Sequence, residues 1–157
     1  MTSSPRLISG DKLPDTDHVL RYVRRKFVDN DQIDGNAFLS RSEEEKKKDG
    51  PSVNWMEFFA GDTASQIAKI RKVKRMKYEK RGRVAKLPVG RTKQYLQEAA
   101  SLAIDCIYDP TPADKDGPDD PSHAYMKGVP VLDTPEGEGV RDFLVHCIVE
   151  SFPVDPD

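Results

Sequence analysis

The sequence lacks the long apolar stretches that a membrane span or a secretion signal requires. No stretch approaches the roughly 18 consecutive apolar residues of a transmembrane helix. The first ten residues also lack the apolar centre of a signal peptide. We therefore expect a cytoplasmic protein that makes no use of a membrane.

Cysteine and histidine are scarce as well, with two and three residues among 157. Cys106 and Cys147 are too few for a disulfide framework and lie too far apart for a zinc-finger spacing, so we expect two ordinary buried thiols. The acidic segment around Gly117 does not match a calcium-binding loop, because aligning that glycine places His123 where a glutamate is needed. The sequence predicts no metal site and no cofactor.

Apolar residues are also below average at 36%, whereas charged residues reach 33%. This composition supports one modest core under a heavily charged surface. We expect a flexible N-terminal lead-in over residues 1–14 and a single compact α+β domain over residues 15–154. It would have about four mostly antiparallel strands and three helices.

Alternating apolar residues predict a strand over 18–27, and turn-forming residues at 29–35 lead to a returning strand at 36–40. The charged run at 43–52 is typical of an exposed loop. The aromatic stretch at 53–59 reaches the core. Two further strands are expected at 83–89, where Pro88 favours a sheet edge or a strand end, and at 103–108.

A first helix is expected from a cap at Asp62 or Thr63 to about Tyr78, and a second after Gly90 with Thr92 as its cap. The clearest helix is the last. Its apolar residues recur at helical spacing from Val140 to Ile148, and Pro153 stops it. Between the last expected strand and this helix, residues 109–137 predict a long irregular loop.

The strongest functional signal is an uneven distribution of charge. Residues 69–93 hold 12 basic residues and one acid, whereas residues 103–157 hold 13 acids and three bases. A basic surface of this kind favours an acidic protein partner or, as a further possibility, nucleic acid. The same segment could instead pack beside the acidic residues and neutralise itself. The candidate contact residues are Arg71, Lys72, Arg75, Arg81, Arg83, Arg91 and Lys93, with Tyr78 and Tyr95 as flat contact area.

The sequence suggests two further candidate sites, one for an anion and one for catalysis. The turn at 87–93 leads from a strand into a helix start, and free backbone N–H groups there could bind an anion with help from Arg91 and Lys93.

Asp120, Ser122 and His123 combine an acid, a hydroxyl and an imidazole, which leaves a small hydrolase or nuclease as the alternative function. Neighbours in sequence rarely form a catalytic triad, so turn hydrogen bonds are the simpler interpretation.

Five stretches carry a resemblance to a family of small uncharacterised bacterial proteins. They are LPDTDHVLRYV (13–23), IDGNAF (33–38), SVNWMEFF (52–59), GRVAKLPVG (82–90) and DPSHAYMKGVP (120–130). This family resembles accessory components of bacterial defence loci, including the small accessory protein of type III-E CRISPR loci. The segment at 43–50 departs from the pattern. The resemblance implies a non-catalytic interaction module of a defence system and assigns no residue a role.

Overall fold

A six-stranded antiparallel sheet organises the protein, in the order β6-β7-β4-β1-β5-β8. The computed structural model describes residues 7–73, 78–115 and 117–154. The sheet strands are β1 (His18–Val23), β4 (Ser52–Trp55), β5 (Arg83–Pro88), β6 (Asp105–Tyr108), β7 (His123–Lys127) and β8 (Glu150–Pro153). A separate hairpin joins β2 (Val28–Asp29) to β3 (Gln32–Ile33). The helices are α1 (Glu43–Lys48), α2 (Thr63–Val73), α3 (Val89–Ala100) and α4 (Pro135–His146), with 3-10 turns η1 (Arg25–Phe27), η2 (Gly35–Phe38) and η3 (Met56–Phe58).

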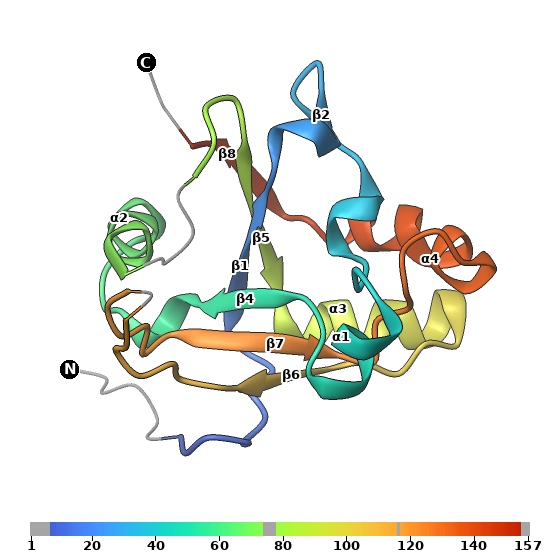
Figure 1. Ribbon diagram of the computed structural model, residues 1–157. Helices are drawn as coiled ribbons and strands as arrows, with labels where there is room; N and C mark the ends of the chain where they lie inside the picture. Colours follow the sequence, from blue (N-terminus) through green and yellow to red (C-terminus); the bar gives the residue numbers. More distant parts are fainter. Residues whose placement is uncertain (1–6, 74–77, 116, 155–157) are drawn as a thin grey trace.

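Strand β1 lies inside the sheet and buries side chains on both of its faces. Val19 and Val23 belong to the larger apolar cluster, which includes residues of α3 and α4. Leu20 and Tyr22 belong to the smaller cluster, to which α2 contributes Ile70. Successive side chains of a strand point to opposite faces, so the sequence HVLRYV serves two cores at once. Figure 1 shows α2 on one side of the sheet and α3 and α4 on the other.

The sheet is splayed next to β1. Strand β1 pairs with β5 over six residues, but with β4 only at Val19 and Leu20. Beyond these two residues β1 and β4 diverge, and in Figure 1 the strands β4, β7 and β6 cross the direction of β1 and β5. The divergence leaves a pocket beside Arg21, with both charged and apolar side chains in its lining.

The α+β class is confirmed, but the sequence underestimated the number of elements. The described residues contain eight strands and four α-helices, where about four strands and three helices were expected. Within the same residues, none of the helices has the length and apolar character needed to cross a membrane.

The strand expected at 18–27 ends at Val23 and is followed by η1, and the segment beyond it also differs from expectation. The turn expected at 29–35 is confirmed only at Asn30 and Asp31, whose φ angles are 50° and 63°, because strand β3 already begins at Gln32. Residues 36–40 do not form the returning strand: Asp34 accepts a hydrogen bond from the Asn36 N–H at 2.9 Å and starts η2 instead. The expected loop at 43–52 contains helix α1, whose first turn is capped by the Ser42 hydroxyl.

The long irregular loop expected at 109–137 is confirmed only in part, because the described residues of 109–122 and 128–134 form no helix or strand, whereas the others do. Strand β7 lies within it and pairs with β4 on one side and β6 on the other, and α4 begins at Pro135. Helix α4 ends at His146, well before the expected stop at Pro153. Pro153 instead belongs to β8, which lies at the sheet edge, where a missing N–H donor is tolerated.

The other expected boundaries are partly confirmed. Helix α2 begins next to Asp62, whose carboxylate accepts from the Ser65 N–H, and its described residues run to Val73; the expected end near Tyr78 depends on residues 74–77, which lie outside the described residues. Strand β5 lies inside the sheet, with Pro88 as its last residue. Thr92 is buried in the first turn of α3 and is not the cap, because Pro88 occupies that position.

Part of the N-terminal lead-in is paired with the sheet. The N–H groups of Gly10 and Leu13 donate to carbonyls of β6, and Asp11 accepts from the Tyr108 N–H. Leu13 is buried in the larger cluster. Residues 10–13 therefore cover the edge strand β6, which would otherwise expose unpaired backbone groups.

Candidate binding surface

The basic run at 69–93 does not form one surface, because β5 divides it. Strand β5 carries the chain through the sheet from Arg83 to Pro88, and its six residues span about 17 Å. Arg81 and Arg83 therefore lie at one end of the strand, and Arg91 lies beyond the other. The Tyr95 ring, 37% exposed, lies with Arg91 on α3, and Arg75 lies outside the described residues.

At the far end of β5, the protein itself fills the predicted anion site. The first two N–H groups of α3, from Val89 and Gly90, donate to the backbone carbonyls of Asp17 and Asp15 at 2.9 and 3.0 Å. Lys93 Nζ lies 3.3 Å from carboxylate oxygens of both Asp15 and Asp105. These two donors and the Lys93 charge are thus matched within the chain, whereas the Arg91 side chain is exposed.

Arg71 and Tyr78 take part in internal packing near the other end. The Arg71 guanidinium donates to the Val154 carbonyl and lies 5.7 Å from the centre of the Tyr78 ring. Tyr78 stacks on Tyr22 with ring centres 4.4 Å apart, and burial raises the pKa of its phenol. Tyr78 is therefore not the free flat surface that the sequence suggested, although it lines a groove of about 570 Å³ together with the exposed Arg71. Lys72 is exposed beside them.

An open groove of about 1000 Å³ brings together basic residues from two distant segments. Arg25 and Lys26 of η1 line it with Lys80, Arg81 and Arg83 at the start of β5. The pairing of Val23 with Arg83 places these segments next to each other. In Figure 1 this is the end of the sheet where the β2–β3 hairpin and the turn before β5 project. Arg25, Lys26 and Lys80 were not among the predicted contact residues; the signal for the first two is the short run RRK after β1.

Four of these five basic side chains face solvent. Arg25, Lys26, Lys80 and Arg81 are exposed, whereas Arg83 bonds to Ser151 of β8 and lies 3.6 Å from Asp31. The hairpin adds two acids to the lining, Asp29 and Asp31, so five bases and two acids leave a net charge of +3. We call this feature, lined by Arg25, Lys26, Lys80, Arg81 and Arg83, the basic groove.

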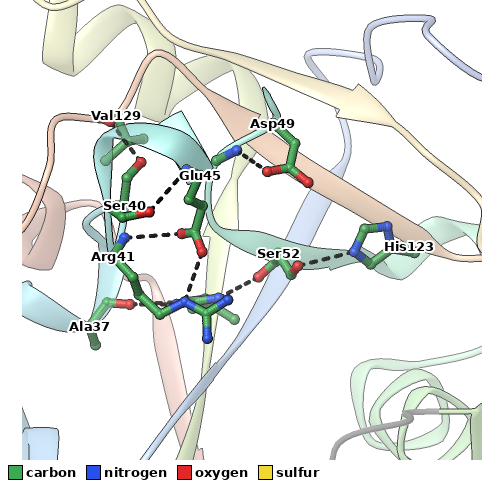
Figure 2. Close-up of polar contacts among 11 residues, drawn as sticks. Ala37, Ser40, Arg41, Glu45, Asp49, Ser52, His123 and Val129 are labelled. Carbon is green, nitrogen blue, oxygen red and sulfur yellow. Dashed lines mark hydrogen bonds and ion pairs between the residues drawn. The ribbon is translucent and has the colours of Figure 1, made fainter. Parts of the chain in front are cut away.

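The three residues of the hydrolase alternative do not form a catalytic arrangement. The Ser122 hydroxyl donates to Asp120 at 2.9 Å and accepts from the Asn54 amide at 2.9 Å, and Asp120 and Ser122 are both buried. The His123 ring faces other groups: Nδ1 lies 2.8 Å from the Asp109 carbonyl and Nε2 lies 3.1 Å from the Ser52 hydroxyl (Figure 2). No hydrogen bond joins Ser122 to His123 in the part of the chain that the structure describes. These contacts favour a structural role.

Within residues 7–73, 78–115 and 117–154, no three His, Cys, Asp or Glu side chains converge as a metal site would require. Comparisons with protein families, with curated proteins and with solved structures found no match for this chain. The geometry and charge of the groove are therefore the features that indicate a function.

The two thiols are buried and unpaired by disulfide, as expected, and we predict that they are inert in the folded protein. Burial raises the pKa of Cys106 from 9.0 to about 12, which leaves roughly one thiolate in ten thousand at pH 8. The pKa of this thiol is higher in the folded state than in the unfolded state. Its contribution to the free energy of unfolding is therefore fully present below pH 9 and is lost as the pH rises toward 12.

A disulfide reagent at pH 8 should label both cysteines promptly in guanidinium chloride and neither one in buffer. Prompt labelling in buffer would contradict the prediction.

Proposed function

We propose that this protein is a non-catalytic interaction module that binds an acidic protein partner through the basic groove. The observation that carries the proposal is the convergence of Arg25 and Lys26 with Lys80 and Arg81 on one open feature. Exposed like charges repel one another and contribute nothing to folding, so a cluster drawn from two segments is best explained by a complementary partner.

An acidic protein suits the groove better than nucleic acid does. Single strands are usually held by aromatic side chains on which bases stack, and none of the residues that line the groove is aromatic. Tyr78 is stacked on Tyr22, and Tyr95 lies beyond the opposite end of β5. Asp29 and Asp31 on the rim would repel a phosphate backbone, whereas a protein can match both signs. The chain as a whole carries a net charge of −2.

The resemblance to accessory proteins of defence loci suggests where the partner would be found. We propose an effector complex of a bacterial defence system, with type III-E CRISPR as the first system to test. In that setting the module would dock by charge complementarity and would need no active site of its own.

Charge reversal of the basic groove tests the proposal. The triple variant Arg25→Glu, Lys80→Glu and Arg81→Glu should lose a stoichiometric partner in affinity capture, with binding weakened at least a hundredfold, because attraction becomes repulsion at three exposed positions. Capture is repeated after nuclease treatment and at two salt concentrations. Recovery of RNA or DNA that disappears with salt would replace the protein partner with nucleic acid.

A matched control reverses three exposed bases elsewhere. Lys47→Glu, Arg91→Glu and Lys127→Glu change the net charge equally but lie on α1, α3 and β7. This variant should keep the partner. If both variants bind alike, the groove is not the contact surface.

A further inference from the structure

A second, smaller pocket lies on the other side of η1, where β1 and β4 diverge. It has a volume of about 120 Å³, the volume that roughly four water molecules occupy in the liquid. Drug-sized ligands need pockets of about 300 Å³ or more, so this one suits a single compact group. Its polar lining consists mainly of Arg21, Arg24, Lys26, Arg41, Asn36 and Glu45.

Arg21 is held rigidly at the base of this pocket. Its Nε and one terminal nitrogen donate to the Ala37 carbonyl at 3.0 and 2.9 Å, and the other terminal nitrogen donates to the Ser52 carbonyl at 2.7 Å. A guanidinium has five N–H donors, so two remain for a ligand after these three bonds. Burial lowers the pKa of Arg21 to about 10, which still leaves it charged at neutral pH.

A carboxylate already lies among these cations. Glu45 accepts from the Arg41 backbone N–H at 3.1 Å and from Arg41 Nε at 2.7 Å (Figure 2). With Arg21, Arg24, Lys26 and Arg41, this single acid leaves a net charge of +3 on the pocket lining. A lining of this sign favours a compact anion.

We propose that this pocket binds the phosphate group of a small molecule, with Arg21 and Arg41 as its principal ligands. Guanidinium groups match phosphate oxygens through paired N–H donors, and a dianion would reduce the net charge of the lining to +1. The pocket holds the phosphate alone, and any attached group projects outward. Lys26 lines both this pocket and the basic groove, so the bound phosphate lies beside the proposed partner surface. The site does not depend on the proposed function.

Calorimetry and arginine side-chain NMR on the full chain test the site with inorganic phosphate, adenosine 5′-monophosphate and adenosine. Phosphate and the nucleotide should bind and shift the Arg21 Nε–H signal, and adenosine should do neither. Equal affinity for the first two identifies a free phosphate as ligand, whereas tighter nucleotide binding identifies a phosphomonoester. Absence of heat and of shifts with millimolar phosphate overturns the proposal.

Two variants make the test specific. Arg41→Met should weaken phosphate binding roughly tenfold or more without unfolding the protein, since its side chain is 71% exposed. Glu45→Gln should strengthen binding roughly fivefold, because it removes a competing negative charge and keeps an oxygen acceptor. Arg91→Met, at the opposite end of β5, is the control and should bind as the wild type does. Equal effects of Arg41→Met and Arg91→Met would show nonspecific attraction and would overturn the site.

Discussion

Replacing Arg21 with methionine is expected to destabilise the protein by about 3 kcal/mol. The Arg21 guanidinium joins η2 to β4 through the Ala37 and Ser52 carbonyls, at the point where β1 and β4 cease to pair. Methionine fills similar space but donates no hydrogen bond. Two carbonyl groups would lose their charged donor, and the diverging strands would lose the group that connects them. Urea unfolding should show a lower midpoint with an unchanged slope.

Arg25→Met is the matched control for this prediction. It removes the same charge four residues away, from an exposed position in η1, and should change the free energy of unfolding by less than about 0.5 kcal/mol. A lysine at position 21 should recover only part of the loss, because a single ammonium cannot reproduce the planar fork of a guanidinium. If Arg21→Met and Arg25→Met unfold alike, the guanidinium does not hold the strands.

The sequence predicted correctly the elements whose buried residues recur at the regular spacing of a strand or a helix. Strand β1 alternates between two cores, and the stripe from Val140 to Leu144 faces the larger core in α4. Helix α1 was missed although Ser42 and Glu45 fit the capping pattern S-x-x-E, because the charged run that follows has no apolar face to mark it as a helix. Its stability comes from capping and from pairs such as Glu44 with Lys48.

Strand β7 could not be predicted from its own residues. HAYMK lies between two proline-rich stretches, and its strand conformation depends on pairing with β4 and β6 on either side. Such non-local pairing leaves little trace in a single segment. The same limit applies to β8, which forms only because β5 is present to pair with it.

The candidate site could be predicted from the sequence only in part. Charge identified Arg81 and Arg83, but the prediction treated residues 69–93 as one surface, although the strand at 83–89 separates its two ends. No local pattern, however, shows that Arg25 and Lys26 meet Lys80, since this depends on the register that pairs Val23 with Arg83. Lys93 was assigned to the surface because its acidic partners, Asp15 and Asp105, come from other segments.

Two glycines in α4 should respond to alanine in opposite directions. Gly137 is buried, and a Cβ atom there would lie 2.3 Å from the Val131 carbonyl oxygen and 3.1 Å from a Leu39 methyl carbon. The Val131 carbonyl cannot shift easily, because it accepts a 2.6 Å hydrogen bond from Thr134, the residue that caps α4. Gly137→Ala should therefore destabilise the protein by about 2–3 kcal/mol.

Gly139, two residues later in the same helix, is exposed and has no atom within 4 Å of the position that a Cβ would take. Alanine there restricts the unfolded chain and favours the helix, so Gly139→Ala should stabilise the protein by about 0.5–1 kcal/mol. Unfolding midpoints of the two single variants provide the measurement, and each serves as the control for the other. Effects of the same sign would mean that helix propensity, and not the close contact with Val131, decides the outcome at position 137. Opposite signs would establish that α4 docks against the Val131 turn through a contact that only glycine permits.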